Sequence, residues 1–191
     1  MSRRLSLLLF LCTIPVAAQD RSLQPNADIA FDQFSKRDKV ITPGLMVYGV
    51  PWTASIDDFK REFGPPTGMF SVRNDAVALI YGRSHVFLFE KGELREVSID
   101  RRLFNYVLEP HVLPHPFFDA QDSVIAPGLK LGMTPAEIMK LLPGKFTPPG
   151  DHDNSSLFVL DHASVQVWYA FVRRPDEPKT REVMSITLRG M

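Results

Sequence analysis

The hexapeptide Val40-Ile41-Thr42-Pro43-Gly44-Leu45 recurs as Val124-Ile125-Ala126-Pro127-Gly128-Leu129, with five of the six residues identical. In both halves of the chain it precedes the same series of segments: a short helical pattern, a Gly/Pro stop and several strand-like runs. A duplicated supersecondary unit explains both the identity and the shared order. The sequence therefore predicts two α/β repeats, over residues 40–100 and 124–191.

The first repeat is expected to begin with a helix from Ser55 to Phe63. Ser55 is a favourable N-cap, and Asp58 three residues later forms an acidic variant of the capping box. Gly64-Pro65-Pro66 then ends the helix. One apolar stripe at helical spacing is expected to face the core: Ile56, Phe59 and Phe63.

The second repeat has a matching helix, predicted from Thr134 to Leu142. Thr134 is the N-cap, Pro135 takes the first helical position, and Glu137 closes the capping box. Pro143-Gly144 stops the helix. The side chains expected to face inward are Ile138, Leu141 and Leu142.

Strand-like segments follow each helix. They are Val77–Tyr81, His85–Phe89 and Leu94–Ile99 in the first repeat, and Leu157–Leu160, Val165–Phe171 and Val183–Leu188 in the second. The last two alternate apolar and polar residues, which is typical of half-buried antiparallel strands. Gly92, between Glu90 and Glu93, provides a hairpin turn. The predicted class is α+β, in which each repeat packs a short helix on an antiparallel meander of three to four strands.

The N-terminus has the three-part pattern of a secretory signal peptide, assigned to residues 1–18. A basic start, Met1-Ser2-Arg3-Arg4, precedes the apolar run Leu5–Val16, and small residues lead to a cleavage site after Ala18. We therefore expect export by the Sec route to the periplasm or beyond, without a lipid anchor. The alternative is a buried N-terminal helix.

Composition narrows the class of protein further. The chain has 191 residues, with 22 Lys and Arg against 22 Asp and Glu; without the two arginines of the signal, its charge is 20 − 22 = −2. A dedicated nucleic-acid-binding protein would carry an excess of basic residues. The charge balance therefore predicts that the chain does not belong to this class. The single cysteine, Cys12, lies in the signal, which leaves no internal disulfide. Residues 19–39 form a polar lead-in, and residues 101–123 join the two repeats as a linker.

The second repeat resembles a known family. Gly132-Met133-Thr134-Pro135-Ala136-Glu137-Ile138, followed by a Gly/Pro stop and an aromatic-rich meander, is similar to SmpA/OmlA (BamE-like) domains. In the first repeat Phe63-Gly64-Pro65-Pro66-Thr67 resembles the helix stop, and Leu88–Leu94 resembles the strand–turn–strand. Tandem copies of this unit form the β-lactamase-inhibitor-protein-like fold. The resemblance implies a non-catalytic exported module that binds a partner over its sheet.

Aromatic residues are the leading candidates for a binding surface. Trp168 lies on the opposite strand face from Tyr169 and Phe171, and Trp and Tyr are typical interface anchors. Trp168, with Trp52 and Tyr48 as helpers, is therefore predicted to contact a protein partner of the cell envelope. The alternative is that these aromatic side chains are buried between the two repeats. The oligomeric state and the identity of the partner are left open.

The sequence also bears on a catalytic or metal-binding function. The chain has no nucleophile elbow, zinc-protease pair, phosphate loop or dinucleotide fingerprint, so an enzyme and a cofactor are not expected. One alternative is a periplasmic protein that binds a metal or small molecule through histidines: His85, His111, His115, His152 or His162. A calcium-like run, Asp151, Asp153 and Ser155, and a hydrolytic pair, Asp161 and His162, are each better explained as turns.

Overall fold

The computed structural model describes residues 37–101, 114–120, 122–173 and 179–191. This part of the chain is mixed α/β, with few helices and most of its regular structure in two sheets. The helices are α2 (Ile56–Phe63), α3 (Pro116–Asp119) and α4 (Pro135–Leu141). The strands are β1 (Val40–Thr42), β2 (Met46–Val47), β3 (Val50–Pro51), β4 (Gly68–Arg73), β5 (Ala76–Tyr81), β6 (His85–Glu90), β7 (Glu93–Asp100), β8 (Val124–Ile125), β9 (Ser155–Leu160), β10 (Ala163–Val172) and β11 (Thr180–Gly190).

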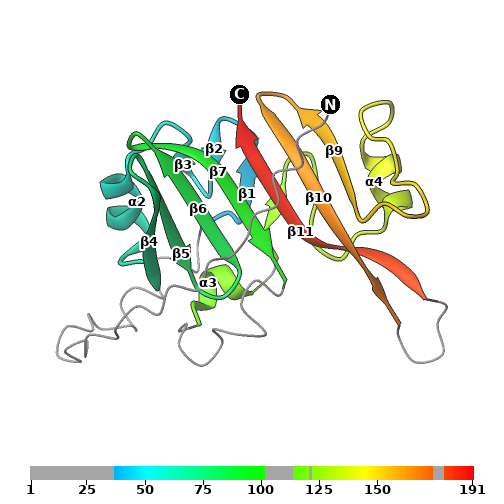
Figure 1. Cartoon of the computed structure of the whole chain (residues 1–191), viewed down its shortest axis with the longest axis horizontal. Coiled ribbons are helices and arrows are strands. Elements are labelled where there is room, and N and C mark those ends of the chain that lie inside the picture. Colours follow the sequence, from blue (N-terminus) through cyan, green and yellow to red (C-terminus); the bar gives the residue numbers. More distant parts are fainter. Residues whose placement is uncertain (1–36, 102–113, 121, 174–178) are drawn as a thin grey trace.

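The larger sheet has seven strands in the order β4-β5-β6-β7-β11-β10-β9. Its first four strands come from the first repeat and its last three from the second, so the two repeats share one continuous sheet. They meet where β7 and β11 pair antiparallel, with Ser98 opposite Thr187. Figure 1 shows these strands between α2 at one end of the molecule and α4 at the other.

The smaller sheet has four strands in the order β3-β2-β1-β8. β1 and β8 are the starts of the two repeated hexapeptides, and they pair parallel, with Val40 opposite Val124 and Ile41 opposite Ile125. The N–H of Ala126 donates to the carbonyl oxygen of Ile41 at 2.8 Å. The two copies of the motif are thus joined through their first two residues, each beside its own counterpart.

Both predicted helices are confirmed, together with their caps. Ser55 and Thr134 each accept a hydrogen bond from the backbone N–H three residues on, and the side chains of Asp58 and Glu137 reach back to complete capping boxes. Phe59, Phe63, Ile138 and Leu142 are buried, as the apolar stripes indicate. These caps matter because helices of two turns have little stability of their own.

The six predicted strands are present, but the chain contains more sheet than the predicted helix-on-meander repeats. β4 was missed because its exposed apolar residues, Met69, Phe70 and Val72, do not alternate regularly with polar ones. The strands of the small sheet are two or three residues long, which is too short for an alternation of apolar and polar residues to be recognised in the sequence. The prediction of a hairpin at Glu90–Glu93 is confirmed, with Lys91 and Gly92 both at positive φ.

One hydrophobic core holds the two repeats together. It contains buried side chains from the small sheet, from all three helices and from one face of the large sheet. Phe117 and Phe118 of α3 belong to it, so the prediction of a linker over residues 101–123 is wrong for this helix. Phe118 packs edge-on against Tyr48 of the first repeat, with ring centroids 5.9 Å apart. The predicted signal over residues 1–18, residues 19–36 of the lead-in and residues 102–113 of the linker lie outside the described residues.

Candidate partner-binding face

The face of the large sheet that points away from the core carries an apolar strip at its β9 end. We call Leu157, Val159 and Trp168 the apolar strip. Leu157 is 73% exposed, Val159 52% and Trp168 45%. Exposed side chains of this size in neighbouring positions are unusual on a monomer and mark candidate interaction sites.

Strand register brings these three side chains together. Trp168 of β10 lies opposite Ser155 of β9, so Leu157 is its diagonal neighbour on the same face. Leu157 lies opposite Gln166, and Val159 lies opposite Ser164. β9 is the last strand of the sheet, so the strip runs along its edge.

A β-bulge separates the exposed Trp168 from the buried Tyr169 that follows it. The pairing of β10 with β11 shifts between Trp168 and Tyr169: Trp168 lies opposite Ser185, whereas Tyr169 lies opposite Val183. Tyr169 faces the core and is buried, as the alternation of the strand predicts. A bulge increases the local twist of a strand, and here it lies directly after the exposed ring.

The middle of the same face is polar. Ser98 Oγ lies 3.0 Å from Thr187 Oγ1 across the β7–β11 pair, and Arg189 Nε lies 3.6 Å from Glu96 Oε2. Burial raises the pKa of Glu96, against the lowering effect of Arg189. The apolar strip therefore borders a zone of hydrogen-bonded polar side chains. Such a combination suits a protein interface, which has an apolar centre and a polar rim.

Trp52 and Tyr48 do not join the apolar strip, which corrects the prediction that they help to form the binding surface. Both side chains are buried in the core. Trp52 packs on Gly190, where an added Cβ would lie 2.8 Å from Trp52 Nε1. Tyr48 is surrounded by aromatic rings, with Phe117 and Phe63 edge-on to it at 5.4 and 6.4 Å. The alternative of aromatic side chains buried between the repeats thus describes these two, but not Trp168.

A buried chain of hydrogen bonds passes through Tyr48. Its hydroxyl donates to Ser123 Oγ at 2.8 Å and lies 2.6 Å from His85 Nε2. The other ring nitrogen of His85 lies 2.7 Å from Ser84 Oγ, which is also 2.9 Å from Asp119 Oδ1. The chain connects β2–β3, β6, α3 and the start of β8, so it cross-links both repeats.

Burial sets the protonation states in this chain. Desolvation lowers the pKa of His85 from 6.5 to about 3, with smaller contributions from the nearby positive charges of His115 and Lys39. Desolvation also raises the pKa of Tyr48 well above its usual range, although the hydrogen bond to Ser123 acts in the opposite direction. Both groups are therefore neutral at pH 7, in line with a structural role for this polar chain.

The histidines named as metal-site candidates lie in different surroundings. His85 is buried, His115 is partly buried against Phe118, and His152 and His162 are exposed in separate loops. His111 lies outside the described residues. Within the residues that the structure describes, no three His, Cys, Asp or Glu side chains come together as a possible metal-binding group.

The two loops that might have carried chemistry are turns, as the sequence indicates. Asp153 Oδ2 accepts the N–H of Gly150 at 3.2 Å, which closes the turn before β9. Asp161 and His162 form the tip of the β9–β10 hairpin, with Asp161 at positive φ. Lys145 Nζ lies 4.0 Å from the Asp161 carboxylate.

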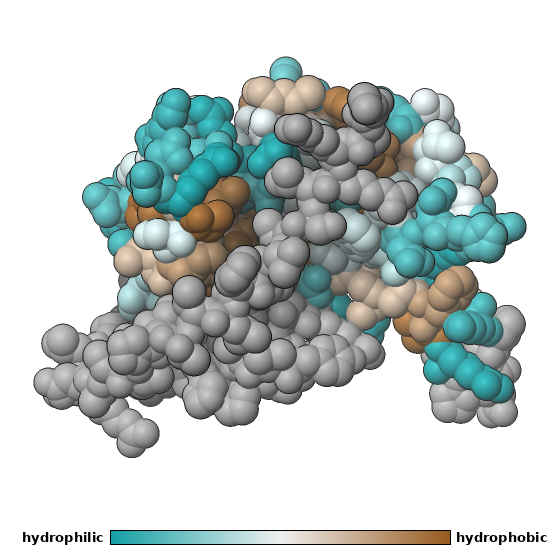
Figure 2. Space-filling model, viewed as in Figure 1, coloured by the Kyte–Doolittle hydropathy of each residue, from teal (hydrophilic) through white to brown (hydrophobic). Residues whose placement is uncertain are grey.

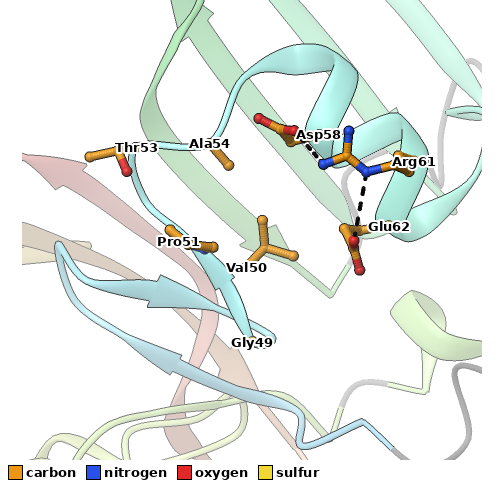
Figure 3. Close-up of a pocket in the computed structure, with 8 residues that line it drawn as sticks. All are labelled: Gly49, Val50, Pro51, Thr53, Ala54, Asp58, Arg61 and Glu62. Carbon is orange, nitrogen blue, oxygen red and sulfur yellow. Dashed lines mark hydrogen bonds and ion pairs between the residues drawn. The ribbon is translucent and has the colours of Figure 1, made fainter.

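A shallow depression of about 430 Å³ lies beside α2 and is lined by Gly49, Val50, Pro51, Thr53, Ala54, Asp58, Arg61 and Glu62 (Figure 3). Its charged side chains are paired with one another: Arg61 contacts Asp58 and lies 3.9 Å from Glu62. Hydrogen bonds from the Ser55 hydroxyl and backbone, and then from Arg61, lower the pKa of Asp58 to about 2. Glu62 also pairs with Arg37 at 2.5 Å, so each charged side chain that lines the depression has a partner of opposite charge.

The far ends of β10 and β11 project as a two-stranded arm (Figure 1). β9 pairs with β10 only up to Trp168, and β7 pairs with β11 only from Ser185, so the remainder of the ribbon has no third strand. Lys179 Nζ and Arg181 Cζ lie 4.5 and 4.9 Å from the ring centroid of Phe171, an exposed residue of the arm. Figure 2 shows hydrophobic and hydrophilic surface side by side there.

Comparisons with protein-family models, with curated proteins and with solved structures find no match to the chain. Among the residues described, none of the helices is both long and apolar enough to cross a membrane. The sequence identified Trp168 but not its neighbours Leu157 and Val159. A leucine and a valine in a predicted strand are normally assigned to the core, but here both lie on the outer face of β9, the last strand of the sheet, and are exposed.

Proposed function

We propose that this chain is an exported, non-catalytic binding protein of the cell envelope, which recognises a protein partner through the apolar strip on the outer face of its large sheet. The observation that carries the proposal is the 45% exposure of Trp168, next to Leu157 on the same face. A partly exposed tryptophan beside a leucine and bordered by polar groups has a composition typical of an interface hot spot.

The proposal includes a duplicated BamE-like architecture. Each unit has a capped two-turn helix, a Gly or Gly/Pro stop and an antiparallel meander, and the helix rests on the meander through apolar side chains. In the first unit Phe59 contacts Phe87 and Phe89 of β6 at 5.2 Å between ring centroids. In the second, Ile138 and Leu142 belong to the same core as Val183 and Ile186 of β11. The finding that both units share one sheet supports a single binding body rather than two separate modules.

The test is capture of envelope proteins on the immobilised chain, compared with Trp168→Ala. The control is Phe171→Ala, because Phe171 lies on the same strand, is 52% exposed and faces the other side of the sheet. We expect Trp168→Ala to lose a captured protein that Phe171→Ala retains, with at least a tenfold loss of affinity, or about 1.4 kcal/mol or more. Equal capture by both variants would rule out the apolar strip as the binding surface.

A further inference from the structure

The two halves of the large sheet are not equivalent at their outer edges. The meander β5-β6-β7 of the first repeat corresponds to β9-β10-β11 of the second, and the two meet at the β7–β11 pair. Beyond β5 the first repeat adds a fourth strand, β4, which pairs antiparallel with it. Beyond β9 no strand follows among the residues described. In the described part of the chain, the second repeat therefore has no strand that corresponds to β4.

The hairpin registers show which positions of β5 and β9 correspond. Tyr81 closes the β5–β6 pair opposite His85, and Leu160 closes the β9–β10 pair opposite Ala163. Counting back from these ends aligns the core-facing Leu79 and Tyr81 with Phe158 and Leu160, all of which are buried. On the outer face, the same alignment matches Ala78 with Leu157 and Ile80 with Val159.

The exposure of these outer positions differs sharply. Ala78 is 1% exposed and Ile80 7%, whereas their counterparts Leu157 and Val159 belong to the exposed apolar strip. β4 contributes to the cover in the first repeat, since a Cβ on Gly68 would lie 3.3 Å from Ile80 Cδ1. The second repeat thus has apolar side chains at both positions, a larger one at Leu157 than at Ala78 and a smaller one at Val159 than at Ile80, and both are exposed.

The backbone of β9 also presents N–H and C=O groups that another strand can bind. The carbonyl oxygen of Asn154 accepts the N–H of Tyr169 in β10 at 2.8 Å. Backbone polar groups alternate in direction along a strand, so those of Ser155, Leu157 and Val159 point to the free edge. β9 contains neither a charge nor a proline, the two features that usually protect an edge strand. The opposite edge, β4, has Arg73 and a bulge next to Ser71.

We propose that the edge of β9 accepts an extended segment of a partner protein, which adds antiparallel as the counterpart of β4. The inference rests on the proposed function for the choice of face. In the first repeat Phe70 lies opposite Ala78, and Arg73 lies opposite Ala76. The added segment is accordingly uncharged along β9 and apolar opposite Leu157. Its carboxyl end is basic, because that end lies beside the start of β9, which the exposed Asp153 precedes.

The sequence of β4 itself supplies the probe, a fluorescent peptide of residues 67–75, titrated with the full chain. We expect saturable binding that Val159→Pro weakens about tenfold, because proline removes an edge N–H and about 1 kcal/mol or more of hydrogen bonding. Val159→Thr keeps the N–H and the branched shape, so it should bind within about twofold of the parent chain. A scrambled peptide controls for non-specific adhesion.

Amide hydrogen exchange of the unmodified chain gives a second readout in case Val159→Pro fails to fold. The peptide should protect the N–H groups of Leu157 and Val159 and leave those of β4 unchanged. Absence of saturable binding, protection at β4 instead, or equal binding by Val159→Pro would each overturn the inference. So would a dimer of the chain alone that Val159→Pro dissociates, since a second copy would then occupy the edge.

The two proposals fail in different ways. If Trp168→Ala retains the captured partner while the peptide still protects β9, the strand site stands and the proposed hot spot is wrong. If capture depends on Trp168 but the peptide neither binds nor protects β9, the strand-addition inference alone is wrong.

Discussion

Ile41 and Ile125 lie opposite each other in the parallel pair of β1 and β8, and each is the second residue of a repeated hexapeptide. Both side chains are fully buried. The recurring hexapeptide therefore has a structural role, because its two copies form the pair of strands that completes the small sheet. A motif that pairs with its own copy couples the stability of one repeat to that of the other.

This pairing predicts similar and coupled effects of substitution at the two sites. Ile41→Val and Ile125→Val should each lower the free energy of unfolding by about 0.5–1.5 kcal/mol, the usual cost of removing one buried methyl group. The double variant should deviate from additivity, because residues in contact share packing. Urea unfolding of the parent chain, the two single variants and the double variant measures this coupling. Val40→Ala, at an exposed neighbouring position, is the control and should cost less; additive losses would show that the pair is not coupled.

Gly44 of the first hexapeptide should tolerate no side chain. It has φ +70°, and an added Cβ would lie 2.5 Å from the Cβ and 2.8 Å from the carbonyl oxygen of His162 in the β9–β10 turn. Gly44→Ala should therefore destabilise the chain by more than the roughly 1–2 kcal/mol of a left-handed residue alone. Gly49→Ala is the matched control, since Gly49 has φ +83° and nothing within 4 Å of its Cβ position. Thermal unfolding that ranked the two variants equally would contradict the close approach to His162.

The two tryptophans should differ in both stability and fluorescence. Trp52→Ala should cost about 3–5 kcal/mol because it empties part of the core, whereas Trp168→Ala should cost about 1 kcal/mol or less. These are the only two tryptophans in the sequence, so Trp168→Phe leaves Trp52 as the sole indole. Its emission should be blue-shifted and poorly quenched by iodide. In Trp52→Phe the remaining Trp168 should be quenched readily; the reverse order would contradict the assigned burial.

Removal of the Tyr48 hydroxyl should lower the free energy of unfolding, because it leaves buried polar groups without a partner. Tyr48→Phe leaves His85 Nε2 and Ser123 Oγ without their short contacts, and the expected loss is about 1–3 kcal/mol. Combining it with Ser123→Ala should cost less than the sum of the single losses, because both partners of one hydrogen bond are then absent. Chemical denaturation of the single and double variants tests this expectation. Strict additivity would indicate that the Tyr48–Ser123 bond contributes little.

His85 should make the folded state sensitive to mild acid. Its pKa is about 3 in the folded chain and 6.5 when unfolded, so between these values the unfolded state binds the extra proton. The stabilising contribution of the neutral imidazole is complete above pH 6.5 and falls as the pH decreases, with a limiting slope of about 1.4 kcal/mol per pH unit. Urea unfolding between pH 5 and 6.5 measures this slope before most carboxylates titrate.

A histidine variant separates this effect from the other titrating groups. His85→Gln should flatten the pH dependence over that window, although it also lowers stability at pH 7. His162→Gln, at an exposed turn, should leave the slope unchanged. A slope that persists in His85→Gln would show that another group controls acid sensitivity.

The sequence by itself determined the local elements, because short-range chemistry controls them. Capping side chains lie three residues from the groups they bind, and strand alternation reflects which side of a strand is buried; both can be read within a window of ten residues. The recurrence of the hexapeptide was also visible, since it requires only a comparison of the chain with itself. The existence of β4 and of the small sheet was not, because their residues lack a regular period.

Only the tertiary structure decided which aromatic side chains are available to a partner. The sequence predicts Trp168 as the anchor and Tyr48 and Trp52 as its helpers, yet these two are covered by α3, the neighbouring rings and the C-terminal strand. Leu157 and Val159 are exposed on the outer face of β9, the last strand of the sheet, and no local pattern encodes that strand order. Exposure depends on what lies beyond each element, and that is determined by long-range pairing between the two repeats.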